Sequence, residues 1–525
     1  MSFRNEVTFE RATKAGNVEE IHSKCEKAYK SLLETAGRSY PNVIDGRERK
    51  APREFEDSCP SDTSLIVGRF QKGTKGDVDD AVLAADGAFK DWSRLDYKDR
   101  LKFFQRAAML MRKDKFLLAA AITLDNGKNR YEAMADVDEA IDFIEYYRWQ
   151  MEKNDGFTRE MRSPYSEEKV MSVLRPYGVW AVICPFNFPA AITTGMTTGA
   201  LITGNTVVLK PSSPVPLPVY MVYDIFSRAG LPDGVLNFVA GPGAEVGGAL
   251  INHRTIRGVV FTGSKDVGYG IIRQTGRAHP IPVIAEMGGK NPIIVTSKAN
   301  VDDAVAGVAN SAFGYGGQKC SACSRVYVHR SVYDEFTSKL VDRTKGIKIG
   351  DPARREVFLG PVVTDKAVKD FENCADMARR DGRIIAGGLT LTDCALGKGH
   401  FVQPTIASDL PPDHYLIKNE LFLPFLCLQK VAGLEEAMKK ANDVEYGLTA
   451  GIFSQDEREL EYFFENTESG VTYSNRKRGG STGAMVGGQA FGGWKASGST
   501  GKGAGGDYYL LQFMREQSRT ACCRT

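Results

Sequence analysis

The chain is poor in the residues that build disulfide scaffolds and metal clusters. Its 525 residues include only ten cysteines and six histidines. Ten cysteines are too sparse for a disulfide framework in a chain of this length. The first residues also lack the apolar core that a secretory signal needs. We therefore expect free thiols in a reducing, cytoplasmic compartment.

The chain also has no large excess of positive or negative charge and no long apolar run. The 68 Lys and Arg nearly balance the 65 Asp and Glu, which gives no support for a nucleic-acid or membrane-surface partner. No run of about 18 apolar residues occurs, so no membrane-spanning helix is expected. With 42% hydrophobic and 25% charged residues, the composition is typical of a soluble globular protein. The length predicts several domains.

The pattern of hydrophobic residues changes along the chain. The first 150 residues are predicted to be mainly helical, with amphipathic helices at residues 77–92 and 134–153. From Gly178 onwards, short apolar runs alternate with helical stretches, which indicates a parallel, doubly wound sheet. A second α/β stretch runs from about Ala299 to Gly470. A hairpin is predicted near residues 157–173, and the chain ends in a predicted strand.

Ligands bind doubly wound sheets at the carboxyl ends of the strands, so the residue after each predicted strand is a candidate. Lys210 there is either a ribose or phosphate ligand or a solvated lysine. The turn at Gly263–Ser264 opens a helix that Ser264 can cap and whose N-terminus favours an anion such as a diphosphate, but it also fits an ordinary turn. Asn187 can donate to an oxyanion or close a turn. Glu286 can serve as a general base or as a structural carboxylate.

The segment GYGGQKCSACSRV, from Gly314 to Val326, holds Cys320 and Cys323 in a C-x-x-C spacing. A zinc site needs a second pair of ligands at suitable spacing, and none is present. A thioredoxin-like dithiol stands after a strand, whereas this pair precedes a strand-like run. A single nucleophilic cysteine, Cys320, fits better, because the glycines before it leave space for a substrate. We expect Cys323 to pack behind the site, and we expect no bound metal.

These candidates occur in one order, from Asn187 through Lys210, Glu286 and Cys320 to the NELF sequence at 419–422. That order resembles the NAD(P)-dependent aldehyde dehydrogenase superfamily over nearly the whole chain. Two motifs carry most of the resemblance: E-x-G-G-K, which begins at Glu286, and F-x-x-x-G-Q-x-C, which ends at Cys320.

The resemblance implies an α/β fold with a Rossmann-type cofactor domain, an α/β catalytic domain and a small β element for oligomerisation. The implied boundaries are residues 1–155 and 174–288 for the NAD(P)-binding domain, 289–475 for the catalytic domain, 156–173 and 507–525 for the oligomerisation hairpin and C-terminal strand, and 476–506 for a substrate anchor loop that returns to the cofactor domain. A homo-oligomer is therefore expected.

The resemblance also implies a mechanism. Cys320 attacks the aldehyde as a thiolate, Asn187 and the Cys320 backbone N–H hold the oxyanion, and Glu286 activates a water that releases the acid. Because a common glutamate that repels a 2′-phosphate is replaced by Ser213, the implied cofactor is NAD with NADP left open. The implied cofactor-binding residues are Lys210, Ser213, Gly263, Ser264, Glu420 and Phe422.

Three stretches look like the 1-pyrroline-5-carboxylate dehydrogenase branch, which oxidises L-glutamate γ-semialdehyde in proline catabolism. They are GQKCSACSRV, STGAMVGGQAFGGWKASGS and GKGAGGDYYLLQFMREQSRT. The resemblance implies that Ser321, Gly483 and Ala484 hold the amino-acid end of the substrate, since backbone N–H groups of small residues can form a nest for a carboxylate. It places Phe188 and Phe491 around the aliphatic part.

Three alternatives stay open at this point. The first is an enzyme of the same fold with another aldehyde, short and aliphatic or derived from a sugar, or with CoA as the acceptor of the acyl group. The second is a binding protein that has kept the fold and lost the chemistry. The third is a thiol-redox or metal protein.

Overall fold

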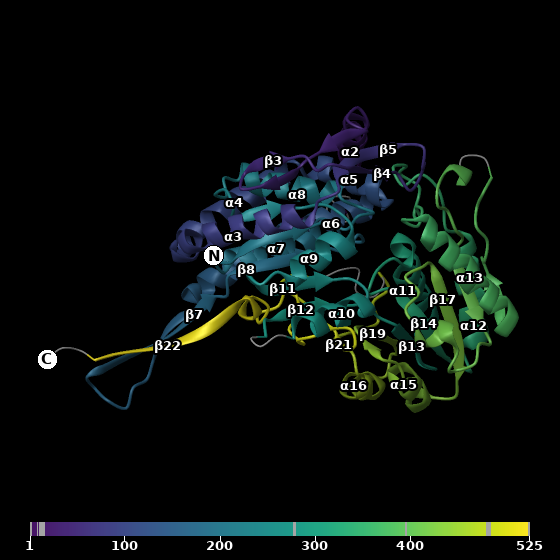
Figure 1. Cartoon of the computed structure of the whole chain (residues 1–525). Helices are drawn as coiled ribbons and strands as arrows, with labels where there is room; N and C mark the ends of the chain where they lie inside the picture. Colours follow the sequence, from purple (N-terminus) through teal and green to yellow (C-terminus); the bar gives the residue numbers. More distant parts are fainter. Residues whose placement is uncertain are drawn as a thin grey trace.

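The structure of the chain is a computed structural model that describes residues 3–7, 9, 16–276, 280–393, 396–478 and 485–522. Two seven-stranded sheets dominate it (Figure 1). The first sheet is built from strands between Asn42 and Glu286, and the second from strands between Asn291 and Ser474. Each sheet is mainly parallel and carries its own helices.

The first sheet has the order β12-β11-β8-β9-β10-β2-β3, and its first five strands are parallel. Strands such as VWAVI and TVVLK are continuous apolar runs because helices cover both faces of the sheet. The strands are β2 (Asn42–Ile44), β3 (Arg47–Arg49), β8 (Val179–Ile183), β9 (Thr206–Lys210), β10 (Leu236–Phe238), β11 (Ile256–Thr262) and β12 (Val283–Glu286).

Helices from two parts of the chain cover this sheet. One face packs against α3, α9 and α10, and the other against a larger layer that includes α4 to α8. The helices are α2 (Val18–Leu33), α3 (Lys75–Arg94), α4 (Tyr97–Lys113), α5 (Lys115–Asn126), α6 (Arg130–Lys153), α7 (Ala191–Ile202), α8 (Leu217–Arg228), α9 (Gly248–Asn252) and α10 (Lys265–Thr275). Between α2 and α3, the strands β1 (Arg38–Tyr40), β4 (Glu54–Ser58) and β5 (Ile66–Gln71) form a small sheet that the helical pattern does not predict.

Helix α6 departs from the sequence prediction. Its pattern predicts an amphipathic helix with a solvated polar face, yet Asp136, Asp138 and Asp142 are all buried. The prediction fails because α6 contacts α4, α5 and α7, so little of its surface is left for water. Buried carboxylates need partners. Asp136 pairs with Lys128, Asp138 with Lys115, and Asp142 accepts hydrogen bonds from Asn5 and Glu6.

The second sheet has the order β15-β16-β17-β14-β13-β19-β20, and only β15 is antiparallel to its neighbour. Its strands are β13 (Asn291–Val295), β14 (Cys323–His329), β15 (Arg383–Ala386), β16 (Thr405–Ser408), β17 (Phe425–Val431), β19 (Thr449–Phe453) and β20 (Val471–Ser474). Its helices are α11 (Val301–Phe313), α12 (Tyr333–Lys345), α13 (Asp365–Asp381), α14 (Tyr415–Lys418), α15 (Leu434–Asn442) and α16 (Glu457–Asn466).

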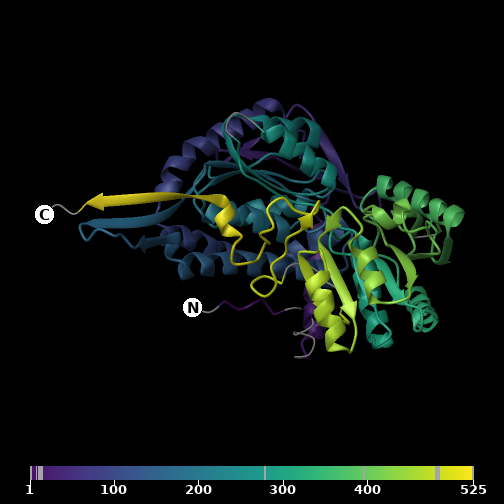
Figure 2. The same ribbon diagram turned by 90° about the horizontal axis from the view of Figure 1, so that it is seen from below.

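A three-stranded antiparallel sheet projects from the body of the molecule (Figures 1 and 2). It consists of β6 (Thr158–Met161), β7 (Glu168–Pro176) and β22 (Met514–Cys522), so the hairpin and the terminal strand predicted from the sequence lie side by side. From Arg515 onwards β22 is exposed. Within the described residues, no helix has the length and apolar character needed to cross a membrane.

Before it reaches β22, the chain passes over the carboxyl end of β12. The Met287 N–H donates to the Ser497 carbonyl at 2.8 Å, and the Ser497 hydroxyl donates to the Gly288 carbonyl at 2.6 Å. A two-stranded ladder of β18 (Tyr446–Gly447) and β21 (Trp494–Lys495) fastens the same segment to the second sheet. The glycine-rich segment predicted as an anchor loop, residues 476–506, therefore has ordered structure over residues 485–506.

Candidate active site

The loop that carries Cys320 is shaped by three residues with left-handed backbone. Tyr315, Gly316 and Gly317 have φ of 46°, 61° and 65°. A Cβ on Gly317 would lie 2.1 Å from the Leu423 carbonyl oxygen, so only glycine fits there. The turn ends α11 and directs the chain towards β14, leaving Cys320 partly exposed just before the strand. Cys323 is buried in β14, and its thiol donates to the Arg325 carbonyl.

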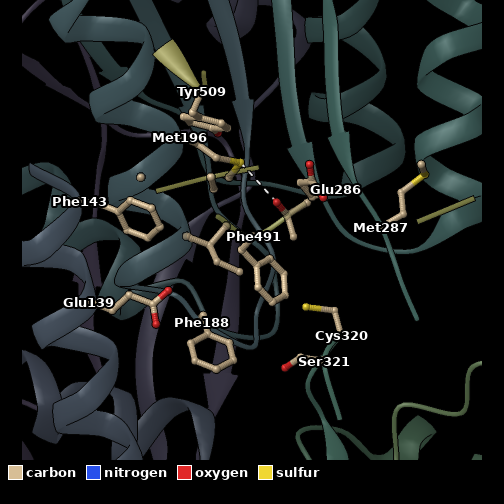
Figure 3. Close-up of a pocket in the computed structure, with 14 residues that line it drawn as sticks. Glu139, Phe143, Phe188, Met196, Glu286, Met287, Cys320, Ser321, Phe491 and Tyr509 are labelled. Carbon is tan, nitrogen blue, oxygen red and sulfur yellow. Dashed lines mark hydrogen bonds between the residues drawn. The ribbon is translucent and has the colours of Figure 1, made fainter. Parts of the chain in front are cut away.

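Cys320 opens into an enclosed pocket with mainly apolar walls (Figure 3). The Cys320 side chain points towards Phe491, while Glu139 and Phe143 lie on the opposite side. The structure thus brings together five residues that the sequence singles out from four separate parts of the chain: Phe188, Glu286, Cys320, Ser321 and Phe491. The other walls come from Glu139, Phe143, Ile192, Gly195, Met196, Thr262, Met287, Ala504 and Tyr509.

Glu286 ends β12 and faces this pocket. Its Oε2 accepts a hydrogen bond from the Gly493 N–H at 3.1 Å, while Oε1 is enclosed without a partner among the described residues. Burial raises the pKa of Glu286 to about 8, and the Gly493 N–H only partly offsets that rise. A carboxyl group with such a pKa can accept and return a proton near neutral pH.

The Cys320 thiol is held in its neutral form. Burial raises its pKa to about 12, and the nearby carboxylates of Glu420 and Glu286 add to the rise. A thiol with this pKa needs a base to become a nucleophile, because the thiolate is the reactive form. Glu286 lines the same pocket and is a candidate for that base.

Asn187 lies in the loop between β8 and α7 and is buried. Its Nδ2 donates to the carbonyl of Gln318 at 3.1 Å, two residues before Cys320. The Asn187 amide therefore ties the loop after β8 to the loop that carries the cysteine. An amide nitrogen has two hydrogens, so this bond uses one of its two donors.

Helix α6 contributes a row of carboxylates that the sequence does not reveal. Glu132, Asp136 and Glu139 are spaced so that they lie on one face of the helix. Glu132 accepts a hydrogen bond of 2.6 Å from Lys319, the residue that precedes Cys320 in the chain. Glu139 lines the pocket. In a sequence these acidic residues look like a solvated helix face, and only their positions four and three residues apart hint at a shared target.

Asp136, the middle carboxylate, holds a buried lysine. Lys128 Nζ lies 2.8 Å from Asp136 Oδ2, and both side chains are fully buried. The other oxygen, Oδ1, accepts from the Ala191 N–H at 2.7 Å, at the start of α7. Lys128 Nζ also lies 3.5 Å from the centroid of the Phe188 ring, so the cation supports a wall of the pocket from behind.

A second hollow lies at the carboxyl end of the first sheet, around Lys210. It is a groove formed by the ends of β8 and β9, the segment 243–252 and helix α10. A Cβ on Gly243, Gly248 or Gly270 would meet nothing within 4 Å, so it would stand in open space. Lys210 Nζ is buried and donates to the Pro211 carbonyl at 2.8 Å, and burial lowers its pKa to about 8. The groove can accept an elongated ligand that carries ribose and phosphate groups.

The other predicted cofactor residues surround the same sheet edge. Gly263 and Ser264 join β11 to α10, and the Gly263 N–H donates to the Glu286 carbonyl at 3.1 Å. The sequence predicts that Ser264 can cap α10. Ser264 occupies the cap position, but its side chain makes no cap hydrogen bond within the described residues. The predicted cap position is therefore confirmed, without a side-chain hydrogen bond among the described residues. Ser213 donates to the Gly241 carbonyl at 3.3 Å.

Glu420 and Phe422 approach from the second sheet. Glu420 Oε1 accepts from the Gly289 N–H at 2.8 Å, and burial raises its pKa to about 7. A Cβ on Gly288 would lie 2.0 Å from Glu420 Oε2, so glycine at that position lets the carboxylate in. The Phe422 ring packs edge-on against Phe186, with 5.6 Å between centroids. The predicted anchor residues Gly483 and Ala484 lie outside the described residues.

Comparison with known proteins places this arrangement in a family. The protein-family model described as "Aldehyde dehydrogenase family" matches residues 47–518. The chain belongs to the aldehyde dehydrogenase family. This membership confirms the predicted superfamily, its α/β fold and the class of enzyme.

Within the aldehyde dehydrogenase family, several of the similar proteins are named 1-pyrroline-5-carboxylate dehydrogenase. It is 39% identical over 495 residues to 1-pyrroline-5-carboxylate dehydrogenase of Geobacillus sp. (strain WCH70), covering 93% of this chain and 94% of the relative. A solved structure described as 1-pyrroline-5-carboxylate dehydrogenase from Thermus with bound NAD has a TM-score of 0.93 and 36% identity, with 99% of both chains covered. Betaine aldehyde dehydrogenase from Staphylococcus aureus is also similar, with a TM-score of 0.88 and 28% identity over 94% of this chain and 96% of that chain.

Proposed function

We propose that the chain oxidises L-glutamate γ-semialdehyde, the open form of 1-pyrroline-5-carboxylate, to L-glutamate in proline catabolism. The observation that carries the proposal is the pocket that joins Cys320, Glu286 and Ser321 between the rings of Phe188 and Phe491. The names of the similar proteins support the same substrate.

The first step is attack on the aldehyde. Glu286 in its ionised form takes the proton of the Cys320 thiol, and the sulfur adds to the carbonyl carbon. The negative charge that develops on the oxygen is stabilised by the second N–H of the Asn187 side chain and by the Cys320 backbone N–H. When bound, the nicotinamide cofactor supplies the acceptor for the hydride that leaves the carbon.

The second step releases the acid. The substrate is now a thioester of Cys320. Once Glu286 has passed the proton of the thiol to solvent, its Oε1 accepts a proton from a water that attacks the acyl carbon. The carbon–sulfur bond breaks, and the sulfur leaves as the thiolate. The unpartnered Oε1 is suited to this exchange because no hydrogen bond has to be broken first.

The pocket offers matching chemistry for the rest of an amino-acid aldehyde. Phe188 and Phe491 would enclose the methylene groups, and Ser321 would donate to the substrate carboxylate. Glu139 lies across the pocket from Cys320, where its carboxylate would favour the substrate ammonium. A role for Gly483 and Ala484 in the carboxylate nest stays a prediction.

The groove around Lys210 fits a dinucleotide. Lys210 would donate to the adenosine ribose, Gly263 and Ser264 would lie at the diphosphate, and Glu420 and Phe422 would hold the nicotinamide riboside. The fit is supported by the open glycine positions of the groove and by the amino group of Lys210, which lines it. We propose NAD as the cofactor, with NADP accepted because Ser213 carries no charge to repel a 2′-phosphate.

The deciding experiment compares substrates. Freshly generated pyrroline-5-carboxylate, propanal and glyceraldehyde are assayed with NAD and with NADP, and with CoA added in parallel. We expect the largest kcat/KM for pyrroline-5-carboxylate and no formation of acyl-CoA. Equal or higher kcat/KM for a simple aldehyde would support the alternative of another aldehyde substrate. Cys320→Ala should abolish the reaction and keep cofactor binding.

We further propose a homo-oligomer in the cytoplasm. The outer strand β22 is exposed beyond Met514, and exposed strand edges favour pairing with another chain. All eight described cysteines are free, which suits a reducing compartment. Light scattering should give a mass above one chain for the whole protein and a smaller assembly after removal of residues 514–525.

A further inference from the structure

A short stretch at the start of the chain contacts both α6 and the C-terminal segment. This stretch, here called the strap, comprises residues 3–7. The Asn5 amide donates at 2.9 Å both to Asp142 Oδ2, on α6, and to the Val486 carbonyl. The Glu6 N–H donates to Asp142 Oδ1 at 2.7 Å. The strap therefore joins α6 to the glycine-rich C-terminal segment across more than 480 residues of sequence.

The strap also fits that segment by shape. The Phe3 ring meets Tyr146 edge-on, with 5.1 Å between centroids. A Cβ on Gly487 would lie 2.8 Å from the Phe3 ring and 3.0 Å from the Tyr146 ring, and Gly487 has a φ of +74°. The backbone of Gly487 is thus packed between two aromatic side chains where no other residue fits. Glu6 pairs with Arg112 at 2.7 Å, which fixes the far end of the strap on α4.

Hydrogen bonds lead from this contact to the substrate pocket. The Gly487 N–H donates to the Gly505 carbonyl at 2.9 Å, and the Gly505 N–H donates to the Tyr147 hydroxyl at 3.1 Å. The neighbouring Ala504 exchanges two backbone hydrogen bonds with Phe491, at 2.8 and 2.9 Å. Phe491 and Ala504 both line the pocket, and the Cys320 side chain points towards Phe491.

We propose that the strap is a positioning element for the substrate pocket: by tying Val486 to Asp142 of α6, Asn5 sets the place of the wall formed by Phe491 and Ala504. The proposal rests on the proposed function for its choice of substrate. A substrate with an amino-acid end would pack its methylene groups against Phe491 on the way to Glu139, whereas a short aldehyde has fewer methylene groups to place against this wall.

The test is the variant Asn5→Ala, with Arg4→Ala as the matched control because Arg4 is an exposed neighbour in the same strap. At pH 8, loss of hydrogen bonds to a carboxylate and a carbonyl should raise KM for glutamate semialdehyde about tenfold. The kcat for this substrate and the kcat/KM for propanal should change less than about twofold. Asn5→Asp should have a larger effect, since it brings a second carboxylate against Asp142.

Hydrogen exchange provides a measurement that does not depend on the substrate. In Asn5→Ala, the amides of Gly487, Phe491 and Ala504 should exchange faster than in Arg4→Ala, while those of β8 and β9 stay protected. Equal losses with both aldehydes, or unchanged KM together with unchanged exchange, would overturn the proposal. If the parent enzyme does not turn over glutamate semialdehyde, the proposed function fails, and the exchange result still decides whether the strap positions the wall.

Discussion

Lys128 Nζ lies 3.5 Å from the centroid of the Phe188 ring, and the same nitrogen forms an ion pair with Asp136 at 2.8 Å. A buried ammonium, a carboxylate and an aromatic ring thus meet directly behind the pocket wall. Burial lowers the pKa of Lys128, and Asp136 opposes that effect. Asp136, on α6, also accepts a hydrogen bond from the Ala191 N–H in the first turn of α7. The pair therefore helps to hold α6 and α7, which both border the site, in place.

Lys128→Met should destabilise the protein strongly. It removes the ammonium and leaves the Asp136 carboxylate buried without its counter-ion, which costs about 3–5 kcal/mol. The double variant Lys128→Met with Asp136→Leu should recover most of that loss, since an apolar pair needs no desolvation of charge. Urea unfolding followed by fluorescence gives the free energies, and a single variant as stable as the parent would contradict the assigned ion pair.

The release of the acid should depend on the ionisation of Glu286. Since the pKa of Glu286 is raised to about 8, its carboxylate fraction grows about tenfold per pH unit below 8 and levels off above. The steady-state rate should therefore rise from pH 6 to 8 and then reach a plateau. Glu286→Gln should remove that limb, which a pH profile measured with saturating aldehyde will reveal.

The reactivity of Cys320 should respond to its two neighbouring carboxylates. Both Glu420 and Glu286 raise the pKa of the thiol, with Glu420 the larger charge effect. Glu420→Gln should therefore shift the pH profile of alkylation by iodoacetamide to lower pH more than Glu286→Gln does. Cys320→Ser identifies alkylation at other cysteines. A profile that does not move in Glu420→Gln would show that burial alone controls the thiol.

Ser213→Glu should change the choice of cofactor. The new carboxylate would repel a 2′-phosphate and accept a hydrogen bond from a 2′-hydroxyl. The kcat/KM with NADP should therefore fall at least about tenfold relative to NAD, which corresponds to an unfavourable charge contact of more than about 1.4 kcal/mol. Ser213→Gln, of similar size and without charge, is the control. Equal losses with both cofactors would mean that the position acts through shape and not through charge.

The residues that carry chemistry were open to prediction because their signals are local. Glu286 begins the E-x-G-G-K motif, and Cys320 ends the F-x-x-x-G-Q-x-C motif. Gly288 and Gly317, one in each motif, are required because a Cβ there would make contacts of 2.0 and 2.1 Å. Such contacts exclude other residues at these positions, so the glycines of both motifs are required by the fold and can be recognised in the sequence. The parallel sheet was predictable for a related reason, because strands covered on both faces have to be apolar throughout.

The carboxylates of α6 and their partner Lys128 were not predictable. Glu132, Asp136 and Glu139 look like the polar face of a surface helix, and Lys128 looks like a solvated lysine in a turn. Their burial depends on α4, α5 and α7, which reach α6 only in the folded chain. The strap escapes prediction for the same reason, since nothing near Asn5 in the sequence hints at Val486.

The general base has a consequence for the synthesis of the protein. Gly493, which donates to Glu286, lies 207 residues further along the chain. A nascent chain that has just exposed Glu286 and Cys320 outside the ribosome has not yet made the segment that closes over them. Because the raised pKa of Glu286 comes from burial, the carboxyl group remains an ordinary, ionised glutamate until the last tenth or so of the chain emerges. Glu286, the proposed general base, can therefore reach its raised pKa only after the segment that contains Gly493 has been translated and has folded back.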